Sequence, residues 1–368
     1  MLKNESGLVF TISGKQIQAD RPAPILSTID VVPYNRGINP NEAIEAIDEG
    51  YPILVNDFYS SGLALLAKLK AHVKARHPDQ LFQGQRNFRA EYFKLSQQIV
   101  LVVRNHKLAV KKAPKIGWLT ILYPELDEFL LPFPQVQGLN SSWQWYEKGI
   151  SIPGLNQKIH PWFGTYFPTR FEHLSLFDHW LKNYKGEKKS AIDVGIGSGV
   201  LTFQLLKYGF EKVLGTDSNP NSIISVNEDL AINQPNSKVD LKQGNLFANS
   251  RLKSELIVFN PPWLPATYLS EGLDKAIYYD ANLFPDFFAQ AKKHLKAEGR
   301  VVLLFSNLAQ LTNVSESHPI ETELAEGGRF KKEYFVRKKA SQASQKTRRN
   351  QNWRNSEMVE LWVLKTTL

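Results

Sequence analysis

From about Ser190 onward, apolar runs of strand length alternate with helical stretches, and this alternation limits the possible folds more than any other feature of the chain. It is typical of a doubly wound sheet, because parallel neighbouring strands are joined by crossover helices. The expected elements, in chain order, are strand 191–194, helix 200–208, a strand reaching Asp217, a helix from Asn219, strand 256–259, helix 284–295 and strands 301–305, 330–336 and 358–364. We therefore predict a doubly wound α/β fold whose sheet is mostly parallel, with an antiparallel final strand.

The first 150 residues do not continue this alternation and are predicted to form a separate mixed α/β domain. The elements expected in it are a helix at 63–73 and strands at 99–103 and 118–122. A stretch rich in Pro, Gly and aromatic residues, 132–164, is the expected junction. The predicted domains are therefore 1–150 and 151–368.

The net charge of +9 is concentrated near the C-terminus. Residues 331–368 carry ten Lys and Arg against three Asp and Glu, and most of the basic residues lie in a predicted loop, 337–354, between the last two strands. Basic side chains with an aromatic neighbour, here Trp353, can follow a phosphate backbone. The same composition is that of a solvated surface loop, so the loop favours an RNA partner without requiring one.

The sequence contains no cysteine, which excludes disulfides, thiolate zinc sites and cysteine nucleophiles. This composition is compatible with a reducing cytoplasm, where we expect the protein. No apolar run approaches the roughly 18 residues of a membrane helix, and the first residues lack the order of a secretory signal. His160, His173 and His179 have no spacing that suggests a metal site, so we expect no metal.

A glycine-rich turn follows the first predicted strand of the C-terminal domain, in the order Asp193-Val-Gly195-Ile-Gly197-Ser-Gly199. Glycines between a buried strand and a helix let the backbone turn tightly and let a ligand approach closely. By itself the motif is weak, since a tight turn without a ligand fits it as well. Nicotinamide-dependent oxidoreductases use a related turn but favour G-x-G-x-x-G, so that class stays as an alternative.

Asp217 lies at the end of the next predicted strand, eighteen residues after Gly199. A carboxylate at this place can accept hydrogen bonds from both ribose hydroxyls of a nucleoside. It can equally cap the following helix, because Asn219 and Pro220 suit a helix start. With the glycine turn upstream, nucleoside binding is the better interpretation.

The sequence Asn260-Pro261-Pro262-Trp263 follows directly on a buried strand, which places it at the carboxyl edge of the sheet beside the glycine turn. Amide and exocyclic amino nitrogens are poor nucleophiles because their lone pair is delocalised. A site can help by accepting hydrogen bonds from both N–H groups while it aligns the nitrogen with an electrophile. The Asn260 side-chain oxygen and the Pro261 carbonyl are suitable acceptors, and Trp263 offers a face for a flat substrate. A Pro-Pro turn with a buried Trp is the alternative, which the position disfavours.

Together these motifs resemble the class I S-adenosylmethionine (SAM)-dependent methyltransferases, in the group that contains release-factor glutamine methyltransferases and small-domain ribosomal RNA methyltransferases. The resemblance covers residues 166–368 and implies a Rossmann-like methyltransferase sheet with SAM as cofactor. It also implies that Asp193 and the three glycines line the cofactor loop and that Asp217 holds the ribose. The target nitrogen would then be held by Asn260, Pro261 and Trp263.

Two further positions follow from the resemblance. The segment Tyr166–Glu172, which includes Pro168, looks like the family's loop before the first strand, which helps to enclose the cofactor. Where the family often has Asp after the third strand, this chain has Asn245, which can still donate to and accept from an adenine edge. The N-terminal domain differs from the compact helical domain of the release-factor enzymes, and its expected role is substrate recognition.

These motifs favour an enzyme that methylates a planar nitrogen, and they leave the acceptor open. The leading hypothesis is an exocyclic amino group of an RNA or DNA base, because the basic loop suggests RNA or a ribosomal component as partner. The alternative is the side-chain amide of a protein glutamine, and a small-molecule acceptor is less favoured. A SAM-binding or RNA-binding module without catalysis is disfavoured by the intact motif at residues 260–263.

Overall fold

The computed structural model describes residues 7–78, 82–168, 170–266, 277–340 and 356–367, with the side chains of 82–86 excepted. Within it the chain forms two units, each with its own sheet. Unit 1 comprises residues 1–9 and 18–147, and unit 2 comprises residues 10–17 and 148–368. All the site residues predicted above belong to unit 2.

Unit 2 is built on a seven-stranded sheet in the order β12-β11-β10-β13-β16-β18-β17. Its strands are β10 (Ala191–Val194), β11 (Val213–Asp217), β12 (Val239–Gln243), β13 (Ser254–Phe259), β16 (Leu295–Ser306), β17 (Phe330–Lys339) and β18 (Met358–Thr366). The first five in chain order pair in parallel, while β18 runs antiparallel to both β16 and β17. The predicted doubly wound sheet with an antiparallel final strand is confirmed.

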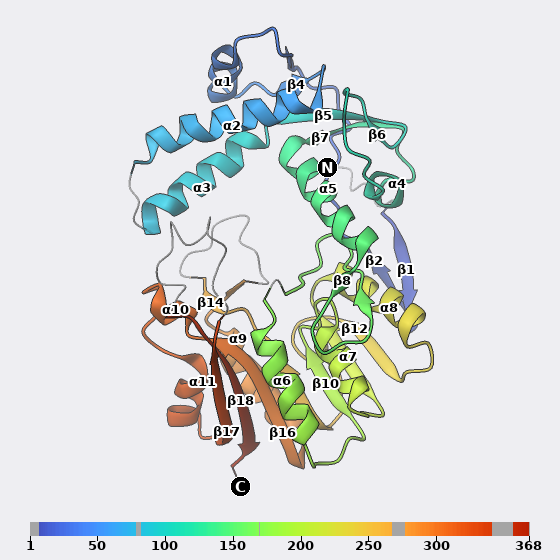
Figure 1. Cartoon of the computed structure of the whole chain (residues 1–368), viewed down its shortest axis with the longest axis vertical. Coiled ribbons are helices and arrows are strands. Elements are labelled where there is room, and N and C mark those ends of the chain that lie inside the picture. Colours follow the sequence, from blue (N-terminus) through green and yellow to red (C-terminus); the bar gives the residue numbers. More distant parts are fainter. Residues whose placement is uncertain (1–6, 79–81, 169, 267–276, 341–355, 368) are drawn as a thin grey trace. The chain divides into compact units, whose positions relative to one another are not determined.

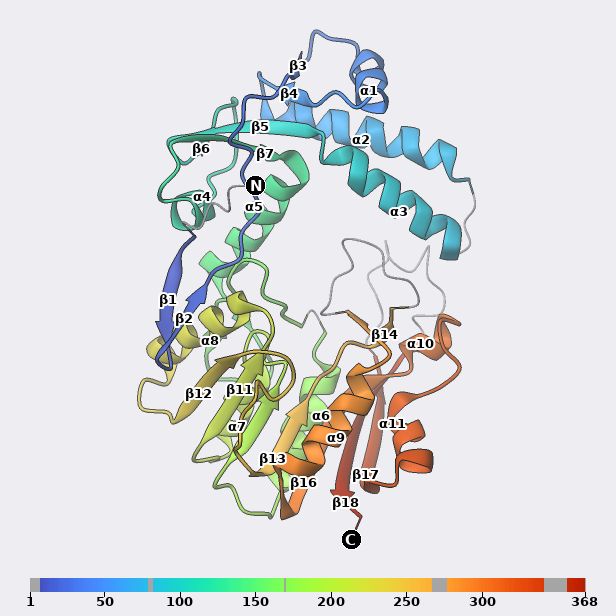
Figure 2. The ribbon, with the colours of Figure 1, turned by 180° about the vertical axis from the view of Figure 1, so that it is seen from behind.

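The helical elements of unit 2 are α6 (Glu172–Asn183), α7 (Val200–Lys207), α8 (Pro220–Asn233), α9 (Leu283–His294), α10 (Leu308–Leu311), α11 (Pro319–Thr322) and a π-helical turn, η1 (Glu323–Gly327). Helix α6 packs against β17 and β18, and α9 packs against β16. Figures 1 and 2 show these two helices on opposite faces of the sheet. The short strands are β8 (Ile150–Ser151), β9 (Lys158–Ile159), β14 (Leu264–Pro265) and β15 (Tyr278–Tyr279). In the described ranges, no helix combines the length and the apolar character needed to cross a membrane.

Because both faces of this sheet are covered, its central strands are continuous apolar runs rather than alternating ones. Every residue of β10 and of β13 is buried. Aromatic side chains from the strands and from α9, among them Phe259, Phe287 and Phe305, form one core cluster. Burying one such ring contributes about 2 kcal/mol of transfer free energy. The cluster therefore holds the carboxyl ends of the central strands in place.

A β-hairpin near the N-terminus, β1 (Val9–Ile12) and β2 (Lys15–Gln18), belongs largely to unit 2. The Ser13 hydroxyl oxygen accepts a hydrogen bond from the Leu241 amide, 228 residues away, at 3.3 Å. The Phe10 ring meets Trp162 edge-on, with the ring centroids 5.3 Å apart. The predicted division at residue 150 did not anticipate this hairpin, because no local pattern reveals so distant a partner.

Unit 1 is a mixed α/β unit, as predicted. Its strands are β3 (Val32–Tyr34), β4 (Ile53–Val55), β5 (Ile99–Arg104), β6 (Lys107–Leu108) and β7 (Glu128–Pro132). Strands β3, β4 and β5 pair in parallel, and β6 and β7 pair antiparallel with β5. Its helices are α1 (Pro40–Asp48), α2 (Tyr59–Arg76), α3 (Phe82–Ser96), α4 (Trp118–Leu122) and α5 (Phe133–Lys148).

The strand predicted at residues 118–122 is wrong, because these residues form helix α4. A five-residue run with four apolar side chains fits a strand and a buried helical turn equally well. In the structure Trp118 is fully buried and donates its indole N–H to the Ser142 hydroxyl at 3.2 Å. It also meets the Trp143 ring edge-on at 5.5 Å. Contacts with α5 therefore decide the conformation of this segment.

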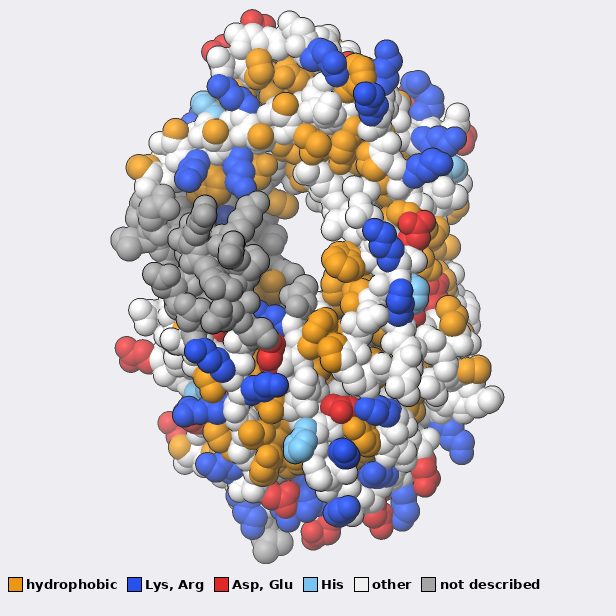
Figure 3. Space-filling view, viewed as in Figure 1, with side chains coloured by type: hydrophobic (Ala, Val, Ile, Leu, Met, Phe, Trp, Pro, Cys, Tyr) orange, Lys and Arg blue, Asp and Glu red, His pale blue; other side chains and the backbone are white. Residues whose placement is uncertain are grey.

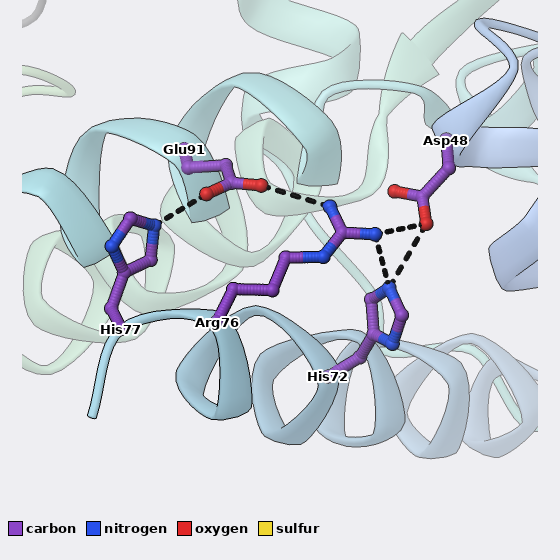
Figure 4. Close-up of polar contacts among 5 residues, drawn as sticks. All are labelled: Asp48, His72, Arg76, His77 and Glu91. Atoms are coloured by element: carbon purple, nitrogen blue, oxygen red, sulfur yellow. Dashed lines mark hydrogen bonds and ion pairs between the residues drawn. The ribbon is translucent and has the colours of Figure 1, made fainter.

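A network of ion pairs joins α1, α2 and α3 in unit 1 (Figure 4). Arg76 pairs with Asp48 and, at 3.0 Å, with Glu91. His72 lies 2.9 Å from Asp48, and His77 lies 2.5 Å from Glu91. Burial opposes the charged form of Asp48, but hydrogen bonds from Arg76 and His72 hold the pKa of Asp48 below its usual value. The hydrogen bond from His77, opposed by burial and joined by one from Arg76, likewise lowers the pKa of Glu91.

We expect Arg76→Met to lower the free energy of unfolding of unit 1 by about 1 kcal/mol at pH 7, a value typical of a partly exposed ion-pair network. Because the folded-state pKa values of Asp48 and Glu91 are lowered, their contribution is present at neutral pH and is lost as the pH falls through them. Urea unfolding at pH 7 and pH 3, followed by hydrogen exchange of α2 and α3, measures the effect. The exposed Lys68→Met, also on α2, is the matched control. An equal loss at both pH values would contradict the electrostatic origin.

Candidate active site

Strand register brings the glycine turn and the Asn-Pro-Pro-Trp motif together at the carboxyl edge of the sheet. β10 and β13 pair in parallel with Val194 opposite Phe259. The next residues, Gly195 and Asn260, therefore begin neighbouring loops. A Cβ atom added to Gly195 would lie 3.3 Å from the Phe259 ring, so the turn approaches β13 closely.

All three glycines of the turn have left-handed φ angles, +66° at Gly195, +51° at Gly197 and +79° at Gly199. Residues with a side chain rarely adopt these angles. A Cβ atom on Gly197 would also lie 3.2 Å from the carbonyl oxygen of Tyr166. The turn thus needs glycine for its own geometry, and it packs directly against the segment that precedes α6.

Asp217 is half-buried at the end of β11 and ties the glycine turn to the start of α8. Its carboxylate accepts hydrogen bonds from the N–H groups of Gly197 and Asn219, both at 2.9 Å. Burial raises the pKa of Asp217, and these backbone hydrogen bonds oppose the rise. The Gly244 N–H donates to the Asp217 carbonyl at 2.8 Å, which brings the exposed Asn245 to the same edge.

Asp193 lies on β10 and is fully buried. Its Oδ2 accepts a hydrogen bond from the Thr202 hydroxyl at 2.7 Å, whereas Oδ1 is buried without a hydrogen-bond partner among the described residues. Burial raises the pKa of Asp193 to about 7, although the Thr202 hydrogen bond works against the rise. A cationic ligand nearby would offset this penalty on the carboxylate.

We expect Asp193→Asn to stabilise the cofactor-free protein at alkaline pH. The folded-state pKa of about 7 lies above the ordinary 3.8, so the wild type loses stability as the pH rises from about 4 to about 7. Asn carries no charge and can still accept the Thr202 hydrogen bond. The gain in free energy of unfolding should reach about 2–4 kcal/mol at pH 8 and be small at pH 4. Thermal melts at the two pH values measure it, and equal shifts would contradict the assignment.

Two side chains at the start of α8, the N-cap Asn219 and Asn221, anchor the segment that precedes α6. The Asn219 side-chain amide donates to the Gly164 carbonyl at 2.8 Å. The Asn221 side-chain amide donates to the Phe163 carbonyl at 2.7 Å. These bonds hold residues 163 and 164, after which the chain passes the glycine turn at Tyr166 and reaches the buried Pro168. The sequence pattern assigned Asn219 to a helix start, and nothing in it indicated the second role.

The motif after β13 contains two buried polar atoms without hydrogen-bond partners among the described residues, the Asn260 Oδ1 and the Trp263 Nε1. Pro261 is buried and Trp263 is half-buried. Since Pro261 and Pro262 have no N–H, the loop offers acceptors but few donors of its own. An unsatisfied buried acceptor costs about 1–3 kcal/mol. The Asn260 oxygen is thus suited to accept an N–H group from a ligand.

Residues 341–354 of the predicted basic loop lie outside the described residues. Residues 337–339 form the exposed end of β17. The Ala340 N–H donates to the Glu357 carbonyl at 2.9 Å, and the buried Glu357 carboxylate pairs with Arg170. The described ends of the loop therefore lie next to the segment that leads into α6.

The residues gathered at this edge fit a nucleoside cofactor that carries a positive charge. The glycine turn gives close access to the backbone, and Asp217 presents a carboxylate beside it. The buried Asp193 supplies a second negative charge with an oxygen that has no partner in the described chain. These are the groups that a ribose and a cationic sulfur would need.

Comparisons with known proteins found matches in sequence and in structure. Residues 175–331 match the methyltransferase small domain family. A Methanocaldococcus jannaschii protein assigned as an N5-glutamine methyltransferase is 29% identical over 167 residues, which cover 43% of this chain and 80% of that protein. The ribosomal protein L11 methyltransferase of Alkaliphilus oremlandii is 27% identical over 128 residues, 33% of this chain and 41% of that protein. A crystal structure of ribosomal protein L11 methylase from Lactobacillus delbrueckii subsp. bulgaricus is 21% identical with a TM-score of 0.38, covering 58% of this chain and 83% of that one.

The family match covers five of the seven strands of the sheet, β10, β11, β12, β13 and β16. It includes the glycine turn, Asp217 and the motif at 260–263. The nicotinamide-dependent oxidoreductase considered from the sequence is therefore set aside. Residues 175–331 therefore form a methyltransferase small domain, and the chain is a SAM-dependent methyltransferase with SAM as its cofactor.

Proposed function

We propose that the enzyme methylates a planar carboxamide nitrogen, the side-chain amide of a protein glutamine. The observation that carries the proposal is the buried Asn260 Oδ1, which has no hydrogen-bond partner among the described residues and stands beside the glycine turn. The N5-glutamine assignment of the M. jannaschii relative supports this acceptor over a base. A protein of the translation apparatus is the expected partner, which implies a cytoplasmic enzyme.

In this proposal the chain positions the acceptor and holds the cofactor. The Asn260 side-chain oxygen and the Pro261 carbonyl accept the two N–H groups of the amide, and Trp263 stacks on its plane. When bound, SAM would supply a methyl group on cationic sulfur: the nitrogen would form the new bond to carbon, the carbon–sulfur electron pair would stay on sulfur, and the nitrogen would lose one proton to water. The cofactor would be held by the glycines of the turn, Asp193, Asp217, Asn245 and Pro168.

A second candidate is the exocyclic amino group of an RNA base, and one observation in unit 1 favours it. Residues 104–124 contain five Lys and Arg and no Asp or Glu, namely Arg104, Lys107, Lys111, Lys112 and Lys115. Figure 3 shows Lys and Arg side chains gathered over β6 and the loop after it. Such a surface suits a phosphate backbone or a ribosomal particle. Substrate recognition by residues 1–150 is part of either proposal.

One labelling experiment separates the candidates. The enzyme and methyl-labelled SAM are incubated with a cell extract, and the product is treated with nuclease or protease. Label in a glutamine amide is protease-sensitive, and acid hydrolysis releases it as methylammonium, which becomes volatile methylamine when the hydrolysate is made alkaline. Nuclease-sensitive label would support the base instead. Label that survives acid hydrolysis as a methylated amino acid would refute the carboxamide proposal.

A further inference from the structure

His173, the second residue of α6, is a buried polar side chain without a hydrogen-bond partner among the described residues. It is 2% exposed, and neither of its ring nitrogens has such a partner. Burial lowers the pKa of His173 to about 4, with the nearby charges of Glu172 and Arg170 acting in opposite directions. The imidazole is therefore neutral at physiological pH, with one nitrogen that donates and one that accepts.

His173 touches the motif that is proposed to hold the acceptor. Its ring meets the Trp263 ring edge-on, with centroids 5.4 Å apart and an interplanar angle of 85°. The indole N–H of Trp263 and the side-chain oxygen of Asn260 are also buried without partners in the described chain. Unsatisfied polar atoms of three residues thus belong to one small region at the carboxyl edge of the sheet.

Several other buried polar groups of unit 2 have partners within the fold, although the Asp193 Oδ1 and the Thr165 hydroxyl have none among the described residues. His318, which is also buried, contacts the Glu360 carboxylate at 3.0 Å. The buried Ser190 hydroxyl donates to Glu255 at 2.6 Å. Because an unpaired buried polar group carries a desolvation penalty, such groups are normally satisfied within the fold. His173 and Trp263, two residues with unsatisfied groups, contact one another, and Asn260 belongs to the same loop as Trp263. Such a grouping indicates a place where a ligand supplies the missing partners.

We infer that His173 is a third polar contact of the acceptor site and donates a hydrogen bond to the carbonyl oxygen of the acceptor carboxamide. The inference rests on the proposed function and deepens it. A carboxamide presents an N–H group and a carbonyl oxygen on the same carbon. Asn260 accepts from the N–H group, and the imidazole N–H of His173 donates to the carbonyl. An isolated amine, such as a lysine side chain, has no atom that could use this second contact.

The edge-on contact with Trp263 offers a structural role for the ring, and one variant separates the two roles. His173→Phe keeps an aromatic ring against Trp263 but removes both nitrogens. His173→Asn removes the ring but keeps a donor and an acceptor. The control is His179→Phe, an exposed histidine on the same helix.

SAM affinity is measured by calorimetry, and transfer from methyl-labelled SAM is measured against a dilution series of the protein fraction of a cell extract. We expect His173→Phe to bind SAM within about 2-fold of the wild type and to lose about 10-fold to 100-fold in kcat/KM, as for one lost buried hydrogen bond. His173→Asn should recover most of that loss, and His179→Phe should match the wild type.

Two outcomes would overturn the inference. If the wild type labels protein amides and His173→Phe does so equally well, His173 makes no contact with the acceptor. If His173→Asn is as impaired as or more impaired than His173→Phe, the ring rather than its nitrogens matters. Failure of the proposed function would give a different result. In that case the wild type and His179→Phe would also leave protein amides unlabelled.

Discussion

Asn260→Ala is expected to retain SAM binding and to lose at least about 100-fold in turnover, the usual effect of removing one preorganised hydrogen-bonding group from a reaction centre. The Asn260 oxygen contacts no donor in the described chain, so its removal breaks no internal hydrogen bond. The cofactor groups at Asp217 and the glycine turn stay in place. Calorimetry with SAM and label transfer to the extract measure the two quantities separately.

The matched control for this variant is Asn183→Ala, which removes an exposed amide at the end of α6 and should leave both quantities unchanged. Asn260→Asp is a second test variant, because it keeps an oxygen acceptor but introduces a negative charge where the Asn260 Oδ1 atom is buried. It should therefore regain part of the activity at low pH, where a buried carboxyl is protonated. Turnover of Asn260→Ala equal to the wild type would remove Asn260 from the reaction.

The sheet of unit 2 could be predicted because its strands are short apolar runs bounded by turn residues. The predicted runs 191–194, 256–259 and 301–305 correspond to β10, β13 and β16. Strands that are buried on both faces are continuous apolar runs, so they can be recognised in the sequence without an alternation of polar and apolar residues. Strand β12 (Val239–Gln243) has an irregular composition and mixed burial, and no apolar run marked it in advance.

Helix α4 of unit 1 and the N-terminal hairpin were less predictable, because distant contacts determine both. Helix α4 contains the same kind of apolar run as a strand, and its packing against Trp143 decides the outcome. The hairpin of β1 and β2 contacts Leu241 and Trp162, which are far away in the chain. Periodicity describes one segment at a time, so it cannot report which distant surface covers that segment.

The candidate site also contains residues that could be predicted from the sequence and one that could not. Motifs with fixed spacing were visible in the sequence, since glycines and Asp217 follow strand ends whose carboxyl edges meet in a parallel sheet. From the sequence, His173 was considered only as a metal ligand, and its spacing did not suggest that role. A single histidine has no spacing to identify it, and its lack of a partner appears only when burial and hydrogen bonds are known.

Asp217→Ala is expected to weaken SAM binding by about 30-fold to 100-fold, as for the loss of a charged acceptor from two hydroxyl donors. Turnover at saturating SAM should change much less, because the carboxylate is remote from the loop at residues 260–263 in the proposed arrangement. Titration with SAM and rates at saturating cofactor test this split. Asp286→Ala, a carboxylate in the first turn of α9, is the matched control.

A loss of affinity alone does not identify the ribose as the partner, because the Asp217 carboxylate also holds the N–H groups of Gly197 and Asn219. Loosening the glycine turn would weaken any nucleoside. Adenosine and 2′,3′-dideoxyadenosine separate the two effects, since they differ in the ribose hydroxyls. If the carboxylate accepts from those hydroxyls, the wild type prefers adenosine by about 10-fold or more and Asp217→Ala binds both alike. If Asp217→Ala still prefers adenosine, the carboxylate affects affinity by holding the glycine turn in place. Another group then binds the ribose hydroxyls.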